Sequence, residues 1–423
     1  MKTTTGFLLI ALFFIFCSPA DAQVWSQFRG TNLDGKAPGQ NLPLVWTADS
    51  NIAWKTEIPG EGWSSPVVYN RQIWLTTSTN YGKELSAICI DREQGEIIHN
   101  LLLFKPDSVY GKHAVNSYAT PTPCIDEKYV YVNFGRYGTA CIQTDNAKTV
   151  WKREDLLCDH VQGPGASPVL YKNMLILHYE GIDSFYIIAL DKTTGKTIWK
   201  TDRPADLYET MPEIGRKAYI TPVIITVNGR DLLISNGSAV CIAYDIETGK
   251  EVWRVVQGED STISMPCYEN GIVYFYTSFV SPPGGEKYCE LMAVNPEGTG
   301  DITETGVLWR ISSPILQLLS PVINNGLIYT IDTNSNLMCI DAKTGNIVYR
   351  QKMKSKYNAS PVLAGGYLYF PATNGKTLVI REGVALEIAA ENNLEGQIWA
   401  SPAVIGNQLL IRTSRYLYLI GGK

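Results

Sequence analysis

Residues Ile188–Lys200 read IALDKTTGKTIWK, and this stretch decides the fold because it recurs along the chain. It predicts a short apolar strand, a polar turn at Thr194-Gly195 and a second strand ending in a large aromatic residue. Four other stretches repeat the pattern: Cys89–His99, Cys141–Lys152, Ala243–Arg254 and Cys339–Arg350. A unit that returns so regularly indicates a repeat architecture.

A second motif sets the number of repeats. A small residue, a Pro and an apolar run, with another apolar residue eight positions after the Pro, occur together eight times. The prolines are Pro66, Pro123, Pro168, Pro222, Pro266, Pro321, Pro361 and Pro402. Each copy predicts four short antiparallel strands, and the first opens at the Pro, where no ladder donor is needed. Eight such copies without sustained helical periodicity predict an all-β, eight-bladed β-propeller.

The two ends of the repeat array complement each other. The last copy stops at Lys423 after three strands, whereas Ile52–Lys55 (IAWK) reads as a fourth strand with no blade before it. We therefore expect Ile52–Lys55 to complete the final blade and to close the ring without an open edge. Each outermost strand then carries one large residue, and the expected set is Trp54, His99, Trp151, Trp199, Trp253, Trp309, Tyr349 and, as a poor substitute, Leu386.

The start of the chain predicts export. Gly6–Phe16 is an unbroken apolar run, and Ala20–Ala22 provides small residues for cleavage before Gln23. The run is shorter than the roughly 20 residues that a spanning helix needs. We expect a signal peptide over residues 1–22, a single propeller domain over residues 23–423, and a periplasmic or secreted location. No membrane span is expected in the mature protein.

Charge and cysteine usage narrow the function classes. The net charge is −5 and acidic and basic residues are interspersed, so nucleic-acid binding has no electrostatic support.

Cys89, Cys141 and Cys339 share one slot of the repeat, and Cys124 and Cys267 share another slot that elsewhere holds Val. A slot that accepts Val or Cys is a small core slot, so we expect free, buried thiols.

The repeat resembles the pyrroloquinoline quinone (PQQ) propeller repeat, through Asp191, Thr194, Gly195 and Trp199 and their equivalents in other copies. The opening Trp25–Gly30 (WSQFRG) looks like the start of the exported PQQ-binding-like propeller family. The resemblance implies that the large aromatic residues and the turn glycines dock neighbouring blades. The residues concerned are Trp54, Trp151, Gly195, Trp199, Gly249, Trp253, Trp309 and Gly345.

The resemblance leaves two kinds of function open. Quinoprotein dehydrogenases typically carry two adjacent cysteines against the quinone, and no Cys-Cys pair occurs in this chain. The propeller of the outer-membrane barrel assembly machinery is a non-catalytic scaffold and is closer in size. We therefore expect no catalytic residues, no metal ligands and no cofactor, with PQQ and calcium kept as the alternative.

Aromatic residues mark the first candidate binding site. Trp63 and Trp399 occupy the same slot, three residues before the repeat Pro, in two blades that ring closure makes neighbours. Tyr219 occupies that slot in blade 4. Because innermost strands line the channel, these rings are placed either to stack a sugar, peptide or quinone ring or to plug the channel.

Polar residues on the long connections of blades 1 to 3 form the second candidate site. Asn116, His160 and Arg203 are expected to form a pocket for an anionic or hydroxylated ligand if their loops converge. The alternative for His160 is a loop histidine bonded to backbone, and His178 is expected to be a satisfied core residue. The repeated aspartates before the turns are expected to bond the turn backbone; they are Asp91, Asp191, Asp245 and Asp341.

Together these features predict a monomeric, exported, non-catalytic binding or scaffold propeller. It would present one face to a protein, peptide or glycan partner. The alternative function is a PQQ-dependent oxidoreductase acting on alcohols or sugars.

Overall fold

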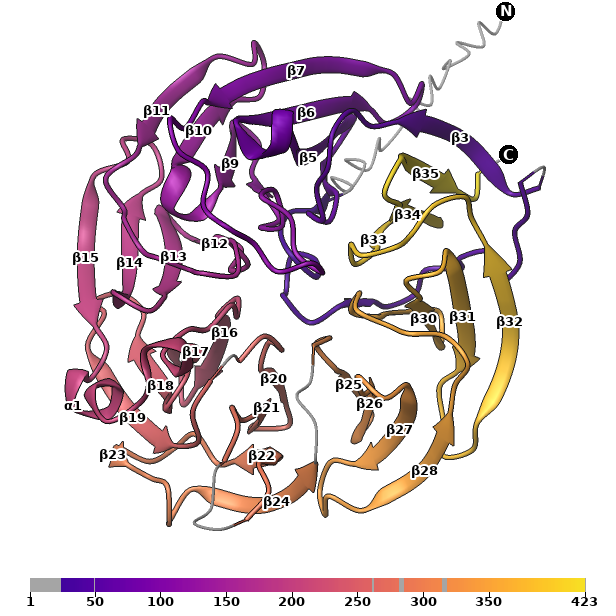
Figure 1. The fold of residues 1–423 in the computed structure, drawn as a ribbon. Coiled ribbons are helices and arrows are strands. Elements are labelled where there is room, and N and C mark those ends of the chain that lie inside the picture. Colours follow the sequence, from indigo (N-terminus) through magenta and orange to yellow (C-terminus); the bar gives the residue numbers. More distant parts are fainter. Residues whose placement is uncertain (1–23, 49, 261, 281–284, 314–317, 423) are drawn as a thin grey trace, which may run out of the picture.

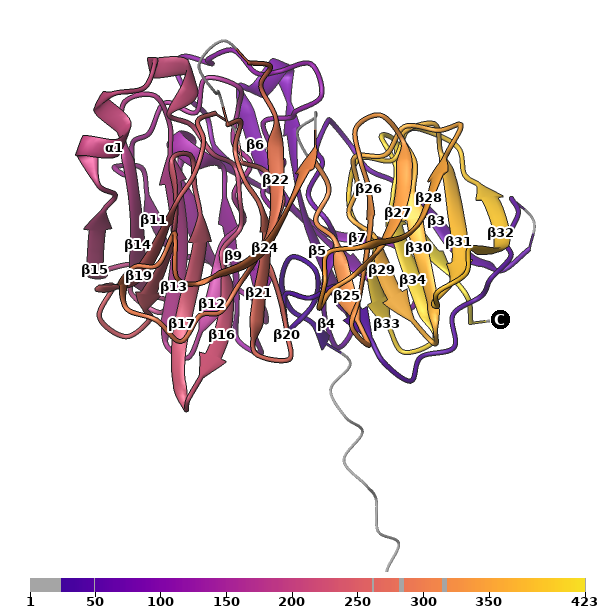
Figure 2. The ribbon, with the colours of Figure 1, turned by 90° about the horizontal axis from the view of Figure 1, so that it is seen from below.

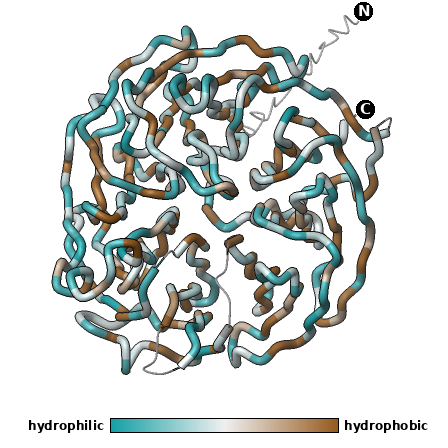
Figure 3. The backbone as a smooth tube through the Cα atoms, viewed as in Figure 1, coloured by the Kyte–Doolittle hydropathy of each residue, from teal (hydrophilic) through white to brown (hydrophobic). Residues whose placement is uncertain are grey.

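The computed structural model describes residues 24–422 apart from 49, 261, 281–284 and 314–317, so the expected signal peptide lies outside the described residues. Eight antiparallel sheets of four main strands form a closed ring (Figure 1). The predicted eight-bladed all-β propeller is therefore confirmed. Hydrophobic residues concentrate in the strands, and the turns and connections are mostly hydrophilic (Figure 3).

The strands of each blade are given from the channel outward. Blade 1 comprises β4 (Val67–Tyr69), β5 (Gln72–Thr79), β6 (Glu84–Asp91) and β7 (Ile97–Phe104). Blade 2 comprises β8 (Cys124–Ile125), β9 (Tyr129–Asn133), β10 (Thr139–Gln143) and β11 (Thr149–Arg153). Blade 3 comprises β12 (Val169–Tyr171), β13 (Met174–Glu180), β14 (Phe185–Asp191) and β15 (Thr197–Asp202). Blade 4 comprises β16 (Val223–Val227), β17 (Arg230–Asn236), β18 (Val240–Asp245) and β19 (Glu251–Val256), flanked by the short parallel β23 (Gly300–Asp301).

The remaining blades follow the same order. Blade 5 comprises β20 (Cys267–Glu269), β21 (Ile272–Tyr276), β22 (Cys289–Val294) and β24 (Val307–Ser313). Blade 6 comprises β25 (Val322–Asn324), β26 (Leu327–Ile331), β27 (Asn336–Asp341) and β28 (Ile347–Lys352). Blade 7 comprises β29 (Val362–Ala364), β30 (Tyr367–Pro371), β31 (Lys376–Arg381) and β32 (Glu387–Asn393). Blade 8 comprises β33 (Ala403–Ile405), β34 (Gln408–Arg412), β35 (Tyr416–Ile420) and β3 (Ile52–Glu57).

The N-terminal strand closes the ring as expected. β3 pairs antiparallel with β35, and Trp54 lies opposite Leu419. The strand runs to Glu57, two residues past the predicted end. Before it, the buried Trp46 stacks on Tyr369 of blade 7 at 6.4 Å between ring centroids, so the same segment also joins blades 7 and 8.

The two faces of the ring differ. The lower face carries the hairpins between first and second strands and the turns between third and fourth strands. The upper face carries the connections between blades, including α1 (Ala205–Glu209) and the short 3₁₀ turn η3 (Glu213–Gly215). It also carries the 3₁₀ turns η1 (Asn80–Gly82) and η2 (Gly135–Tyr137). On this face blades 1 to 5 rise higher than blades 6 to 8 (Figure 2).

Residues 24–37 lie across the lower end of the channel. In Figure 1 this segment is the indigo trace through the centre of the ring. β1 (Val24–Trp25) pairs with β4 of blade 1, and β2 (Lys36–Ala37) pairs with β29 of blade 7. Between them the carbonyl of Ser26 accepts the N–H of Ile125, in blade 2. The segment therefore covers inner strand edges that would otherwise be unpaired.

Arg29 anchors this segment from the centre of the molecule. Its guanidinium is buried and donates to the carbonyl oxygens of Ser320 (3.0 Å) and Pro321 (2.7 Å) in blade 6 and of Asp34 (2.9 Å). Burial lowers the pKa of Arg29 to about 10, so the side chain remains charged at neutral pH. The lower end of the channel is thus closed by a segment that the blades hold on several sides.

Tryptophan–glycine contacts join neighbouring blades. The indole Nε1 of Trp54 donates to Arg92 O of the next blade at 2.7 Å, and that of Trp199 donates to Ile246 O at 3.1 Å. Trp151 and Trp309 make the equivalent bonds at 3.0 Å each. Each indole lies over a turn glycine of the next blade: Gly95, Gly195, Gly249 and Gly345. Because the glycines have no side chain, the rings approach the turn backbone closely.

Two positions depart from this scheme. Trp253 is buried but lies beside β23 and the Ile302 side chain, because residues 295–306 replace the usual turn in blade 5. The expected Leu386 lies outside β32; the residue in the tryptophan register of blade 7 is Ala390, opposite Val379. The expectation for Leu386 was wrong because this residue still lies in the turn between β31 and β32, before the fourth strand begins at Glu387.

The cysteines and turn aspartates have the structural roles expected of them. The eight described cysteines are free and buried. Asp191 accepts the backbone N–H groups of Thr193 and Thr194 through its Oδ1, and Asp341 accepts that of Thr344. Hydrogen bonds from the Thr193 and Thr344 hydroxyls lower the pKa of these two carboxyl groups. The repeated aspartates therefore shape turns in separate blades.

Candidate functional site

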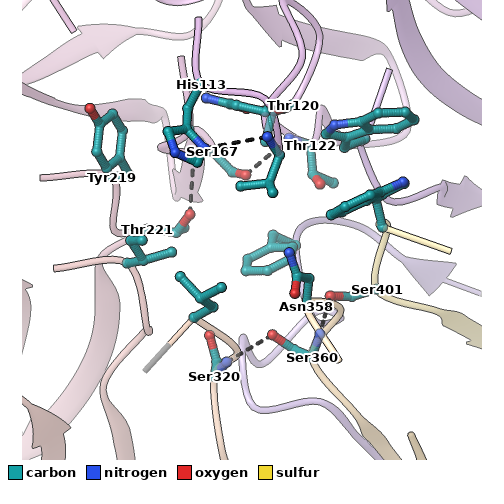
Figure 4. Close-up of a pocket in the computed structure, with 18 of the residues that line it drawn as sticks. His113, Thr120, Thr122, Ser167, Tyr219, Thr221, Ser320, Asn358, Ser360 and Ser401 are labelled. Atoms are coloured by element: carbon teal, nitrogen blue, oxygen red, sulfur yellow. Dashed lines mark hydrogen bonds between the residues drawn. The ribbon is translucent and has the colours of Figure 1, made fainter. Parts of the chain in front are cut away.

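A cavity of about 510 Å³ occupies the upper part of the channel (Figure 4). Residues from the connections of all eight blades line it, and Phe28 of the N-terminal segment contributes from below. Since residues 24–37 close the lower end, the cavity is a funnel that opens on the upper face. The aromatic candidates Trp63, Tyr219 and Trp399 all line it.

Trp63 and Trp399 form the aromatic edge of the funnel. Their rings stack with centroids 5.6 Å apart and planes inclined by 24°. Trp63 is held by its backbone N–H, which donates to Ala119 O at 3.1 Å. Trp399 donates from its indole Nε1 to Gln397 Oε1 at 3.3 Å. The repeat equivalence of the two residues, together with ring closure, brings the two rings together.

Tyr219 forms part of the opposite wall and has no free hydroxyl hydrogen. Its OH donates to His160 O at 2.8 Å, and its backbone N–H donates to Thr262 O at 2.8 Å. Burial raises the pKa of the phenol. Gly165 lies against this ring, where an added Cβ would be 2.8 Å from Tyr219 Cβ. Tyr219 is therefore a fixed apolar wall of the funnel.

Asn116 joins the two long connections that follow blades 1 and 2. Its Nδ2 donates to the carbonyl oxygens of Gln162 (2.8 Å) and Pro164 (3.2 Å). Its Oδ1 accepts the hydroxyl of Thr120 at 2.5 Å and the N–H of Ser117 at 2.8 Å. All polar atoms of this side chain are thus engaged, and Asn116 lines the funnel mainly as a brace between loops.

His160 lies outside the funnel lining. Its imidazole is buried and packs against Tyr179, with 5.8 Å between ring centroids. No hydrogen bond joins its ring to backbone within the described residues, so packing, rather than the expected backbone bond, holds it. Burial lowers the pKa of His160 to about 4, which keeps the ring neutral at pH 7.

Arg203 also lies outside the lining, in a buried polar network between blades 3 and 4. Its Nε lies 3.2 Å from Glu180 Oε2 and donates to Tyr208 OH at 2.7 Å. His178 Nε2 lies 3.0 Å from the same carboxylate oxygen, and its Nδ1 forms a hydrogen bond of 2.9 Å with the Ser235 hydroxyl, so the ring has polar partners in the core as expected. The structure therefore does not bring Asn116, His160 and Arg203 into one pocket.

The Glu180 carboxylate is the centre of that network. Burial alone would raise its pKa, but the Arg203 guanidinium and the His178 ring lower it below its ordinary value. The carboxylate also accepts the Ser238 N–H at 2.6 Å. These bonds tie the α1 connection, which leads to Tyr219, to two blades. The network shapes one wall of the funnel from behind.

A ring of hydroxyl groups surrounds the funnel, and the sequence analysis missed it. The residue before the repeat Pro is Ser or Thr in seven blades: Ser65, Thr122, Ser167, Thr221, Ser320, Ser360 and Ser401. All seven side chains are buried and line the cavity. Six backbone N–H groups at this slot each donate to the hydroxyl of the next blade at 2.9–3.0 Å, and Figure 4 shows several of these bonds. Met265 interrupts the ring in blade 5.

This hydroxyl ring had a signal in the sequence. The slot before the Pro holds a small residue in seven copies, yet Thr occurs there twice and Ala nowhere. Such a preference indicates a hydrogen-bonding role, because a purely steric slot would also accept Ala. What the sequence did not show was that one blade's hydroxyl accepts the N–H of the preceding blade.

The described lining carries almost no net charge. Asp260 is the one Asp, Glu, Lys or Arg among the described lining residues. It forms an ion pair with the Lys217 ammonium, which is itself buried. The imidazole of His113 is exposed at the rim and accepts the N–H of Val115 at 3.3 Å.

The described lining does not fit PQQ with calcium. PQQ carries three carboxylates, and no Lys or Arg of the described lining faces the funnel to balance them. Calcium needs six to eight oxygen ligands, and no group of three or more His, Cys, Asp or Glu among the described residues is placed to hold a metal.

Comparison with known proteins supports the repeat. A family model described as outer membrane protein assembly factor BamB matches residues 183–303 and 301–386. The chain is a PQQ-like repeat β-propeller similar to BamB.

Curated relatives represent two kinds of protein. BamB of Yersinia pestis is 22% identical over 53% of this chain and 66% of its own length. A quinohemoprotein alcohol dehydrogenase of Pseudomonas putida is 25% identical over 42% of this chain and 25% of its own length. A tetrathionate hydrolase of Acidithiobacillus ferrooxidans is 21% identical over 60% of this chain and 50% of its own length. The chain thus spans between a quarter and two thirds of these relatives.

Solved structures share the fold. BamB from Moraxella catarrhalis matches with a TM-score of 0.58 at 12% identity, over 87% of this chain and 99% of that one. The quinohemoprotein alcohol dehydrogenase of Comamonas testosteroni matches with a TM-score of 0.69 at 11% identity, over 95% and 81%. At these identities the likeness concerns the fold alone. Within the described residues, no helix has the length and hydrophobicity to cross a bilayer.

Proposed function

We propose that this protein is an exported, non-catalytic binding propeller whose upper-face funnel receives part of a protein, peptide or glycan partner. The observation that carries the proposal is the funnel itself. It is open above, closed below by residues 24–37, and edged by the stacked Trp63 and Trp399. Aromatic residues with one exposed face supply large binding contacts at low entropic cost.

The lining favours binding over catalysis. General acid–base or nucleophilic catalysis needs a titratable group oriented by a partner. In the described lining His113 has only a backbone partner, and Asp260 is neutralised by Lys217. The similarity to BamB, which is named as an outer membrane protein assembly factor, supports a scaffold role.

The alternative is a PQQ-dependent oxidoreductase, which the similarity to quinohemoprotein alcohol dehydrogenases favours. The neutral lining argues against a quinone-dependent enzyme, because its described residues offer no free cation for the PQQ carboxylates. Reconstitution with PQQ and calcium, followed by dye reduction with alcohols and sugars, separates the two functions. Catalytic turnover would contradict the binding proposal and support the oxidoreductase.

Titration of the purified protein against panels of peptides and oligosaccharides tests the binding proposal. We expect a ligand whose affinity falls about tenfold or more in Trp63→Ala, because a stacked aromatic contact and its buried area are lost. The matched control is Tyr81→Asn, an aromatic on the same face that is 94% exposed and lies outside the funnel lining. Equal loss in both variants would contradict a role for the funnel.

A further inference from the structure

We infer that the funnel takes the uncharged end of a neutral oligosaccharide, with Trp63 and Trp399 as the stacking surface and the hydroxyl ring as the polar wall. The inference rests on the proposed function and narrows its ligand to one class. It is carried by the shape of the funnel, by its charge and by the unused hydrogen-bonding groups in its wall.

The shape selects the end of a chain. Residues 24–37 close the lower end, and the Phe28 side chain reaches the cavity from that side. A polymer can therefore not thread through the ring. A linear chain that fills the funnel without folding back on itself must enter from the upper face with one of its ends. The upper face is less high along blades 6 to 8 than along blades 1 to 5 (Figure 2), so we place the rest of the chain on that side.

The charge of the lining selects a neutral end. A peptide end carries an ammonium or carboxylate group, and burying such a charge without a partner is strongly unfavourable. In the described lining Asp260 already pairs with Lys217, and no other Asp, Glu, Lys or Arg is present. The end of a neutral sugar chain carries no charge and avoids that cost.

The hydroxyl ring supplies donors. Because each ring hydroxyl except that of Ser65 accepts a backbone N–H, its own hydrogen remains to be donated. These hydrogens have no acceptor among the described residues. The six side chains are at most 5% exposed and line the cavity, so their donor capacity faces the funnel. Sugar hydroxyl and ring oxygens are acceptors of the matching kind.

Two further features of the wall match a sugar. The side-chain amides of Asn358 and Gln162 line the funnel and have no hydrogen-bond partner within the described residues, so both can donate and accept. The stacked pair of Trp63 and Trp399 offers an apolar surface of the size of a sugar ring. A pyranose has one face of C–H groups and an equatorial rim of hydroxyls, which fits an aromatic wall beside polar groups.

Calorimetric titration with short neutral oligosaccharides tests the inference on the full mature chain. The probes are gluco-, manno-, galacto- and N-acetylglucosamine oligomers, and a parallel panel contains free-ended and end-capped peptides. We expect one neutral oligosaccharide series to bind, with affinity reduced about tenfold or more in Trp399→Ala and about fivefold in Asn358→Ala. Tyr81→Asn is the matched control and should bind as the wild type does.

Two controls keep the result interpretable. Asn358 makes no hydrogen bond within the described residues, so Asn358→Ala should keep the wild-type melting temperature even if Trp399→Ala does not. A bulky aglycone at the reducing end and a bulky substituent on a hydroxyl of the non-reducing end block the two ends in turn. Only one of the two blocks should abolish binding, because the funnel is closed below.

The outcomes separate the inference from the proposed function. Peptide binding that depends on Trp399, without oligosaccharide binding, overturns the inference and leaves the binding proposal standing. Oligosaccharide binding that the two funnel variants leave unchanged also overturns it. Binding of charged oligosaccharides alone would show that the lining does not select a neutral ligand and would contradict the inference as well.

Discussion

His160 shows how burial changes a single residue. Sequence context suggested either a ligand or a backbone-bonded loop histidine, and the structure places its ring against Tyr179 with its carbonyl bound by Tyr219. The residue therefore acts on the funnel indirectly, through the position of Tyr219. Its neutral, buried ring also makes the stability of the fold depend on pH.

Burial holds the pKa of His160 at about 4, against about 6.5 in the unfolded chain. Between about pH 4 and pH 6.5 the unfolded chain binds a proton at His160 and the folded chain does not, so acidification favours unfolding. The free energy of unfolding, as far as it depends on His160, is therefore highest above about pH 6.5 and falls as the pH is lowered toward 4. We expect His160 to cost the wild type about 2 kcal/mol of its free energy of unfolding between pH 7.5 and pH 5, and His160→Gln to lack this part of the loss. Urea unfolding at both pH values measures it.

The exposed His113 is the matched control for this measurement. Because the His113 ring is exposed, His113→Gln tests whether the loss of any histidine has the same effect. If the wild type and His160→Gln lose stability in parallel on acidification, the assignment to His160 is wrong.

At the scale of elements, the turn between third and fourth strands is the unit that joins blades. Its Asp bonds the turn backbone, and its Gly lies beneath the indole of the preceding blade. The polar residues of the Ile188–Lys200 turn thus serve local structure. The same turn is replaced in blade 5, where Trp253 docks differently.

Gly249 provides a test of this docking. Its φ is +69°, and an added Cβ would lie 2.5 Å from Trp199 Cε3. Gly229 has a similar φ of +76° but no neighbour within 4 Å of an added Cβ. We expect Gly229→Ala to lower the free energy of unfolding by about 1 kcal/mol from backbone strain, and Gly249→Ala by about 1–3 kcal/mol more from the clash.

Chemical denaturation of the two variants measures the difference. Equal destabilisation would mean that the contact between Trp199 and Gly249 adds nothing beyond the turn conformation. Because the two glycines differ in their surroundings but not in the sign of φ, the comparison isolates the docking contact.

At the scale of the whole molecule, the N-terminal region closes both the ring and the channel. Residues 24–37 cover the lower end of the channel, and β3 supplies the outer strand of blade 8. Residues from opposite ends of the sequence thereby become neighbours, including Trp63 and Trp399. The funnel exists only because the ring is closed.

Removal of residues 23–60 should therefore abolish cooperative folding, since blade 8 loses its outer strand and the channel loses its cover. Arg29→Met is a milder companion variant that removes only the bonds to Ser320, Pro321 and Asp34. We expect it to melt cooperatively but to lose about 2 kcal/mol of stability. Calorimetry of both variants measures these effects, and a truncated chain with the wild-type melting temperature would refute the closure.

The sequence predicted the fold well because the repeat carries its own local signals. Turn residues, strand periodicity and the Pro slot recur eight times, so an error in one copy, such as Leu386 for Ala390, did not alter the count. The site was predicted less well. Trp63 and Trp399 were paired correctly because they share a slot, whereas Asn116, His160 and Arg203 were grouped by loop length alone.

By itself the sequence determined the blade number, the closing strand and the places where aromatic residues approach the channel. The tertiary structure decided which polar groups face the funnel, because that depends on side-chain direction and on partners from distant blades. Arg203 is engaged by Glu180, whereas the hydroxyl of Ser360 accepts one bond and keeps a donor for the funnel. Such contacts join residues far apart in the chain, and local sequence signals do not encode them.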